Sequence, residues 1–200
     1  FHITDEDLGV GGAKAKFRMN MDAINLLKEL EFDGRQATPE EQAILSKYVG
    51  WGGLADAFDE TKDNWKNEFA ELYATLSPEE YAAARSSMLN AHYTSPVVIK
   101  AIYEAVGNMG FETGNILEPS MGVGNFFGCL PEAMQNSKLY GVELDSITGR
   151  IAKQLYPKAD ITIAGFETTD RRDFYDLAIG NVPFGQYQVN DRAYNKLGFS

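Results

Sequence analysis

Residues 116–125 read ILEPSMGVGN and join a short apolar strand to a loop with two glycines. Glu118 stands directly at the end of the strand, and Gly122 and Gly124 allow the backbone to bend sharply and to approach a ligand closely. Position 127 is Phe, so the third glycine of the dinucleotide fingerprint is missing. A carboxylate beside this loop would repel a pyrophosphate, whereas it suits a ligand that carries an ammonium group. An ordinary structural turn is the alternative interpretation of the glycines alone.

Short apolar strands recur downstream at residues 139–144, 161–163 and 177–179, and helical stretches lie between them near 125–136 and 146–156. Strands that alternate with helices predict an α/β fold: a doubly wound, mostly parallel sheet with helices on both faces. Such sheets bind ligands at the carboxyl ends of their strands. The polar motifs of this sequence all fall at those ends or at the start of a helix.

The upstream half has a helical pattern up to about residue 90. Thr38–Glu41 and Ser77–Glu80 are capping boxes with proline at the first helical position, and Ser95-Pro96 predicts a further helix start. Residues 48–54 (YVGWGGL) predict a tight turn, and the Gly-rich residues 1–18 predict a loose or partner-dependent arm. We therefore expect a helical N-terminal extension over 1–90 and a ligand-binding domain over 91–200. Because the chain starts at Phe1 and ends soon after a motif, we expect a C-terminally truncated piece of a longer polypeptide.

Composition excludes several classes of protein. The 200 residues are 44% hydrophobic and 12% aromatic, enough for a buried core. Neither a membrane-spanning run nor a signal peptide is evident, and the single Cys129 fits a reducing cytoplasm. With only His2 and His92 beside that cysteine, we expect no metal site. The net charge of −11 differs from the basic footprint of most nucleic-acid binders, so a nucleic-acid ligand would need a local cationic groove or contacts with parts outside this chain.

Two further strand ends carry candidate ligand contacts. Glu143 ends the second strand, where an acid can accept the hydroxyls of a ribose. Gly165, Phe166 and Glu167 follow the third strand. Phe166 is a candidate cover for an adenine ring, and a core phenylalanine is the alternative.

The fourth strand is followed by Asn181-Val182-Pro183-Phe184. An amino group held here would donate hydrogen bonds to the Asn181 side-chain oxygen and to a backbone carbonyl, which leaves the nitrogen lone pair freer to attack. The proline stiffens the loop, and the aromatic ring offers a stacking face. An ordinary Asn-x-Pro turn is the alternative.

These motifs, in this order, resemble the gamma-type adenine-N6 DNA methyltransferases, which use S-adenosylmethionine (SAM). The resemblance covers about residues 90–190. Val182 stands where the family usually has proline, and Gly165 where many members have Asp. The matching residues are Tyr93 and Thr94 for motif X; Glu118, Pro119, Ser120, Gly122, Gly124 and Asn125 for motif I; Glu143 for motif II; Phe166 and Glu167 for motif III; and Asn181, Val182, Pro183 and Phe184 for motif IV.

The resemblance implies a SAM-dependent methyltransferase fold and methyl transfer to adenine N6 in DNA. Thr94 and Glu118 would hold the methionine tail of SAM. Asn181 and the Val182 carbonyl would hold the adenine amino group, while Phe184 stacks on the extruded base. The helical lead-in resembles large mobile-element proteins that fuse such a domain to a Swi/Snf-type helicase, which makes DNA and a helicase domain the expected partners.

Two alternatives stay open from the sequence. The same motif IV serves enzymes that methylate RNA or protein glutamine. A non-catalytic SAM-fold module that docks a helicase is the other alternative, and the acidic charge favours it. Labelled-methyl assays on DNA, RNA and protein distinguish the first alternative from a DNA methyltransferase. Calorimetry with SAM tests the second, because an empty module would not bind SAM.

Overall fold

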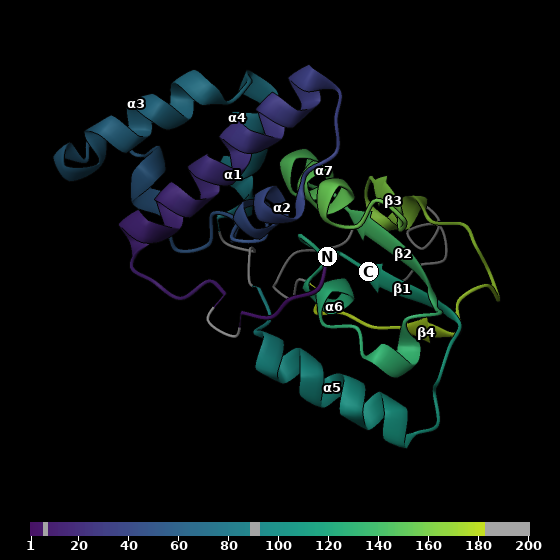
Figure 1. The fold of residues 1–200 in the computed structure, drawn as a ribbon. Helices are drawn as coiled ribbons and strands as arrows, with labels where there is room; N and C mark the ends of the chain where they lie inside the picture. Colours follow the sequence, from purple (N-terminus) through teal and green to yellow (C-terminus); the bar gives the residue numbers. More distant parts are fainter. Residues whose placement is uncertain (6–7, 89–92, 183–200) are drawn as a thin grey trace, which may run out of the picture.

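The computed structural model describes residues 1–5, 8–88 and 93–182 (Figure 1). The N-terminal part contains α1 (Ala13–Asp33), α2 (Pro39–Leu45), η1 (Ala55–Phe58), η2 (Asp63–Trp65), α3 (Lys66–Thr75) and α4 (Pro78–Ser87). We call residues 13–88 the helical module. The remainder contains α5 (Pro96–Asn108), β1 (Asn115–Pro119), α6 (Asn125–Gly128), η3 (Glu132–Met134), β2 (Lys138–Glu143), α7 (Ser146–Leu155), β3 (Asp160–Ile163), η4 (Phe166–Thr168) and β4 (Leu177–Ala178).

The predicted helix starts are confirmed. At α2 the Thr38 hydroxyl accepts a hydrogen bond from the Glu41 amide at 3.3 Å, and the Thr38 amide donates to the Glu41 carboxylate at 2.8 Å. Ser77 and Glu80 make the same reciprocal pair at α4. These bonds satisfy amides that a helix terminus leaves without partners.

The four strands form one parallel sheet in the order β3-β2-β1-β4, which confirms the predicted α/β class. Because all strands run the same way, their carboxyl ends meet at one edge. The chain moves outward from β1 to β2 and β3, and then returns to the other side of β1 for β4. The crevice between β1 and β4 is therefore where a sheet of this kind binds ligands.

The two faces of the sheet are packed differently. Ile116 packs with residues of α5 and α6, and Ile161 packs with residues of α7. The register places Ile116 beside Leu139 and Ile161 beside Gly141, so these helices share one face. On the other face the ring of Tyr140 packs edge-on against Phe174 and Tyr175, and the Arg171 guanidinium lies 5.1 Å from the centre of the Tyr140 ring.

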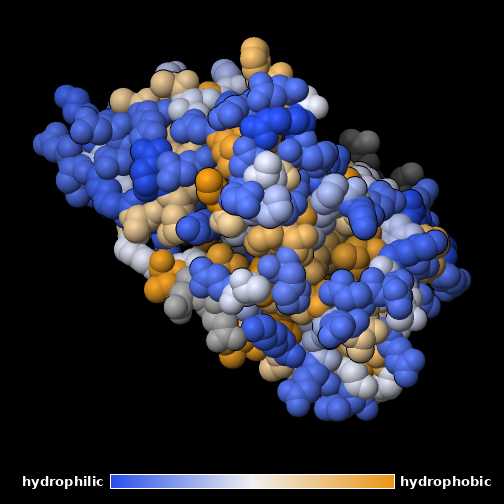
Figure 2. All heavy atoms as spheres, viewed as in Figure 1, coloured by the Kyte–Doolittle hydropathy of each residue, from blue (hydrophilic) through white to orange (hydrophobic). Residues whose placement is uncertain are grey.

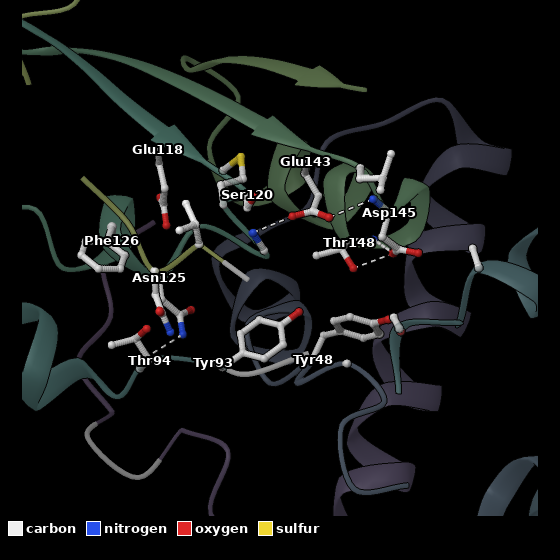
Figure 3. A pocket seen from close by; sticks show the side chains of 18 of the residues that line it. Tyr48, Tyr93, Thr94, Glu118, Ser120, Asn125, Phe126, Glu143, Asp145 and Thr148 are labelled. Carbon is white, nitrogen blue, oxygen red and sulfur yellow. Dashed lines mark hydrogen bonds between the residues drawn. The ribbon is translucent and has the colours of Figure 1, made fainter. Parts of the chain in front are cut away.

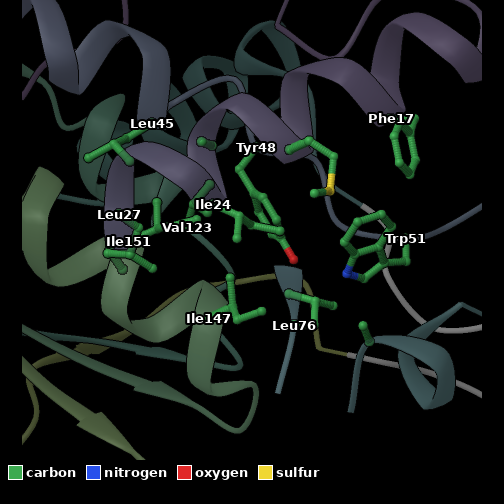
Figure 4. Packing of buried hydrophobic residues seen from close by; sticks show 14 of the residues in the cluster. Phe17, Ile24, Leu27, Leu45, Tyr48, Trp51, Leu76, Val123, Ile147 and Ile151 are labelled. Carbon is green, nitrogen blue, oxygen red and sulfur yellow. The ribbon is translucent and has the colours of Figure 1, made fainter. Parts of the chain in front are cut away.

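The helical module shares a continuous hydrophobic core with α7 (Figure 4). Ile24 and Leu27 of α1 belong to the same cluster as Ile147 and Ile151 of α7. Polar contacts add to this packing: Arg150 of α7 donates to Glu80 of α4 at 2.7 Å. Gln42 of α2 donates to the carbonyl of Gln154 at 2.9 Å. The module is thereby fixed against the helix that follows β2.

The polarity of the surface is consistent with a hydrophobic core inside the molecule. Hydrophilic residues cover most of the face in Figure 2, and apolar residues gather mainly near its middle. Among the described residues, no helix combines the length and apolar character that a bilayer span requires.

The expectation of a loose arm over residues 1–18 is wrong. Ile3 is only 3% exposed, and its amide donates to the Gly128 carbonyl at 2.8 Å. Helix α1 already begins at Ala13, since alanine and lysine favour a helix once the glycines end. Lys14 pairs with Glu68 at 2.6 Å, and Arg18 pairs with Glu71 at 2.7 Å. The charges of Lys14 and Arg18 are thus paired with acidic residues of the same chain.

Asn20 of α1 fixes the turn that follows α2. Its side chain is completely buried, its Nδ2 donates to the Gly50 carbonyl at 2.6 Å, and its Oδ1 accepts from the Val49 amide at 2.9 Å. One side chain therefore satisfies a donor and an acceptor of a buried turn that cannot pair within a helix or strand. The Tyr48–Gly50 backbone is held in place from α1.

We expect Asn20→Ala to lower the free energy of unfolding by roughly 3 kcal/mol, because two buried backbone groups lose their partners. Urea denaturation measures this change. Asp22→Ala is the matched control on the same helix: Asp22 is exposed and pairs with Arg18 at 3.0 Å, so its loss should change stability by less than about 0.5 kcal/mol. Equal losses in the free energy of unfolding for the two variants would contradict this role of Asn20.

Candidate functional site

A cavity of about 590 Å³ opens at the carboxyl ends of the strands (Figure 3). This volume lies within the usual range of small-molecule sites. Its described lining comes from both parts of the chain. From the α/β part it takes Tyr93, Thr94, Glu118, Ser120, Met121, Gly122, Asn125, Phe126, Glu143, Leu144, Asp145, Thr148, Asn181 and Val182, and from the helical module it takes Tyr48, Gly50, Ala83, Ser86 and Ser87.

Glu118 is a buried acid that faces this cavity from the end of β1. Its side chain is 3% exposed, and its Oε2 has no hydrogen-bond partner among the described residues. Burial raises the pKa of Glu118 well above its ordinary value, and the nearby Glu143 adds to this, while the amides of Phe126 and Phe127 oppose it. A buried acceptor without a partner is costly. A cationic donor in the cavity would remove that cost.

The loop after β1 turns through left-handed backbone at Ser120, Gly122 and Gly124, whose φ angles are 56°, 58° and 83°. A Cβ at Gly122 would lie 3.2 Å from the Tyr93 ring, and one at Gly124 would lie 2.6 Å from the Tyr156 ring. Glycine is therefore required at Gly124 by both conformation and space. The loop brings the Gly122 backbone to the cavity.

Glu143 is held at the end of β2 by two backbone amides. Gly122 donates to its Oε2 and Asp145 donates to its Oε1, each at 2.8 Å. Burial raises the pKa of Glu143, although these amides oppose the shift. Each carboxylate oxygen keeps a lone pair, so the group can also accept hydrogen bonds from a ligand diol.

Hydroxyls and aromatic rings complete the cavity around these acids. Tyr48 and Tyr93 lie side by side below Glu143 and Thr148 in Figure 3. Thr148 donates to Asp145 at 2.6 Å. At the other end, Asn125 donates to the Thr94 carbonyl at 3.4 Å, which links the loop after β1 to the segment before α5.

The charge of the lining selects among ligands. Glu118, Glu143 and Asp145 are acidic, and the described lining contains no lysine or arginine. A phosphate would meet repulsion and find no cationic partner here, whereas an ammonium or sulfonium group would be attracted. The fold and the site together define an α/β protein with an acidic cavity at the carboxyl edge of a parallel sheet, and this cavity suits a cationic or neutral small molecule better than a phosphate.

The structure brings most of the predicted site residues to one cavity, although they come from distant segments. Pro119 and Gly124 shape the backbone beside it without lining it. Phe166 and Glu167 lie on η4 with exposed side chains, Phe166 being 49% exposed, and the described lining includes neither. Pro183 and Phe184 lie outside the described residues. The predicted residues in the lining are Tyr93, Thr94, Glu118, Ser120, Gly122, Asn125, Glu143, Asn181 and Val182.

The sequence reasoning missed the contribution of the helical module. The sequence of residues 48–54 predicts a turn and no ligand contact, yet Tyr48 and Gly50 line the cavity, as do Ala83, Ser86 and Ser87. The turn itself was the available signal, since tight glycine turns often present backbone to a ligand. Within the described residues, no cluster of His, Cys, Asp or Glu could hold a metal ion.

Two known proteins are similar to this chain in sequence. Over 169 residues the chain is 29% identical to Defense against restriction protein B of Escherichia phage P1, which covers 83% of this chain and 6% of that protein. Over 120 residues it is 34% identical to the type II methyltransferase M.CvrRI of Paramecium bursaria Chlorella virus XZ-6E, which covers 60% of this chain and 30% of that protein. The chain is thus homologous to a type II methyltransferase over part of its length, and it spans less than a third of either relative.

A solved structure from Listeria monocytogenes, assigned to the class I SAM-dependent methyltransferases, aligns with a TM-score of 0.42 and 16% identity, covering 92% of this chain and 62% of that one. No protein-family model matches the chain.

Proposed function

We propose that the cavity binds SAM and that the chain is the catalytic part of a larger methyltransferase that acts on the N6 amino group of adenine in DNA. The observation that carries this proposal is the buried carboxylate oxygen of Glu118, which has no hydrogen-bond partner in the part of the chain that the structure describes and lies in an acidic cavity that Asn181 also lines. The Glu118 oxygen suits a cationic amino-acid tail, and the Asn181 side chain suits an amino group to be methylated.

The residues present fit SAM. Glu118 would accept a hydrogen bond from the ammonium group of the methionine tail, with Thr94 and Asn125 beside it. Glu143 would accept the ribose hydroxyls. SAM lacks phosphate, which agrees with a described lining without lysine or arginine. When bound, SAM supplies a methyl group activated by its sulfonium, so the task left to the protein is to position the acceptor and exclude water.

Asn181 and Val182 follow β4 at the edge where Glu118 ends β1. In our proposal the Asn181 side-chain oxygen and the Val182 carbonyl accept hydrogen bonds from the adenine amino group, which orients its lone pair. The base must leave the duplex to reach this position. The sequence supplies Phe184 as its stacking partner, a role worth roughly 1–3 kcal/mol per base in other proteins.

Homology to a type II methyltransferase and the order of the motifs support the DNA substrate. The net charge of −11, and the pairing of Lys14 and Arg18 within the chain, lead us to propose that most DNA contacts belong to other parts of a longer protein. A helicase domain in that protein is part of the same proposal, as is a cytoplasmic location.

The test is a labelled-methyl assay that offers DNA, RNA and protein in parallel to this chain and to the longer protein that contains it, together with calorimetry of SAM binding. We expect SAM binding by this chain and transfer to adenine N6 in DNA. Transfer only to RNA or to glutamine would replace the substrate. SAM binding without transfer by the longer protein would favour a docking module, and no SAM binding would overturn the proposal.

A further inference from the structure

We infer that the helical module forms one wall of the cofactor site and contacts the nucleoside half of bound SAM. This inference rests on the proposed function and adds residues from outside the motifs. It assigns a ligand-contacting role to the Tyr48–Gly50 turn and to the last two turns of α4.

The order of residues along the cavity decides which half of SAM meets the module. Glu118, Thr94 and Asn125 lie at one end, and Glu143, Asp145 and Tyr48 lie at the other (Figure 3). In SAM the ribose joins the methionine tail to the adenine. With the ammonium at Glu118 and the ribose at Glu143, the adenine lies on the far side of Glu143. Tyr48 of the module lies at that end (Figure 3), and α4 is tied through Glu80 to Arg150 of α7, the helix that Asp145 caps.

The wall is rigid because each of its two parts is anchored elsewhere. Tyr48 is 2% exposed, and Asn20 fixes the backbone that follows it through the bonds to Val49 and Gly50. Helix α4 begins at the Ser77 capping box, and its Glu80 also binds Lys28 of α1 at 3.0 Å and Arg150 of α7 at 2.7 Å. Neither part needs a ligand to hold its position.

The chemistry of this wall suits a nucleobase. Ala83, Ser86 and Ser87 have small side chains that leave room. The hydroxyls of Ser86 and Ser87 donate to the Ala83 and Ala84 carbonyls, each at 2.8 Å, so their oxygens remain able to accept a hydrogen bond from the amino group of a base. Tyr48 adds an aromatic ring. Burial raises the pKa of Tyr48 and the negative charge of Asp145 adds to this, while a hydrogen bond with Thr148 opposes it, so the hydroxyl stays protonated. An aromatic surface with a few polar groups is typical of small-molecule sites.

Neighbouring alanines of α4 provide a matched test. Ala83 lines the cavity, whereas Ala82 is exposed and does not line it. Ala83→Phe should weaken binding of SAM by at least about tenfold, because the added ring occupies the nucleoside end; Ala82→Phe should stay within about twofold. Calorimetry measures both. The same measurement with 5′-methylthioadenosine, which has the nucleoside but lacks the amino-acid tail, should give the same loss for Ala83→Phe.

Ser86→Phe is the second variant, since Ser86 is exposed, lines the cavity and tolerates bulk without disturbing the core. Thermal unfolding identifies a variant that fails to fold. The inference is then tested on whichever of Ala83→Phe and Ser86→Phe folds. If it binds SAM and 5′-methylthioadenosine as tightly as the parent chain does, the inference is overturned while the proposed function stands. A parent chain that binds no SAM overturns both.

Discussion

Replacing Asn181 by alanine should reduce methyl transfer by at least about 100-fold while the affinity for SAM changes by less than about threefold. The side-chain oxygen is proposed to act on the acceptor and not on the cofactor, so its loss removes an interaction made mainly in the transition state. Losing one such preorganised polar group typically costs 100- to 1000-fold in rate, about 3–4 kcal/mol.

The position of Asn181 makes this separation of effects reasonable. It follows β4, and the preceding Gly180 lies so close to β1 that a Cβ there would be 3.6 Å from Cγ of Glu118. The acceptor edge and the cofactor carboxylate are therefore neighbours on different strands. Truncating a side chain after β4 leaves the backbone of β1 and its loop intact.

Two further variants serve as controls for this measurement. Asn181→Asp keeps an acceptor oxygen and should transfer methyl groups faster than the alanine variant. Asn108→Ala removes the same side chain from the exposed end of α5, away from the cavity, and should have no effect. Single-turnover transfer and calorimetry are run on all variants, within the longer protein if this chain alone is inactive. Transfer by Asn181→Ala at the parent rate would remove Asn181 from the mechanism.

The local features of this fold could be predicted from the sequence because their causes are local. Ser77 and the glutamate three positions later define a capping box independently of the rest of the chain, and α4 begins there with Pro78 at its first position. Short runs of apolar residues predict the strands, and the alternation of these strands with helices predicts a parallel sheet. The meeting of Glu118, Glu143 and Asn181 at one edge follows from that topology alone.

Contacts between distant segments could not be predicted in the same way. Nothing near Tyr48 indicates that Asn20 holds the following turn or that α7 lies opposite it, because both depend on how the helices pack. Ile3 shows the same limit: a polar, glycine-rich context hid one side chain that is buried beside α6.

Helix α5 shows why periodicity alone does not identify a buried face. Apolar residues occur all around it, in the two sets Val98, Ile102, Ala105 and Ile99, Tyr103, Val106. The structure buries the second set and exposes the first. Both have helical spacing, so the choice depends on a tertiary contact: Tyr103 donates to the Phe126 carbonyl at 3.1 Å.

Glu118→Gln should have opposite effects on ligand affinity and on stability. The variant loses a charge-assisted hydrogen bond to the ammonium group of SAM, typically worth about 1.5–3 kcal/mol, so affinity at pH 8 should fall between about 10- and 100-fold. Binding of 5′-methylthioadenosine, which has no ammonium group, should be nearly unchanged. Equal losses for both ligands would place the amino-acid tail elsewhere.

Stability should change in the other direction because burial raises the pKa of Glu118 above its ordinary value of 4.5. Below pH 4.5 the acid is protonated whether the chain is folded or unfolded, so it carries no charge penalty. As the pH rises from 4.5 toward the raised pKa, the unfolded chain ionises first, which destabilises the folded state progressively. Glu118→Gln should therefore be more stable than the parent at neutral pH, and this advantage should disappear near pH 4.

The same linkage predicts how SAM binding depends on protons. An ammonium group in the cavity favours the Glu118 carboxylate, so binding at a pH below the raised pKa must release a proton. Calorimetry in buffers of different ionisation enthalpy detects that release, and Glu118→Gln should abolish it. A proton release that persists in the variant would assign the titration to another group, with Glu143 as the next candidate, because burial raises its pKa in the same direction.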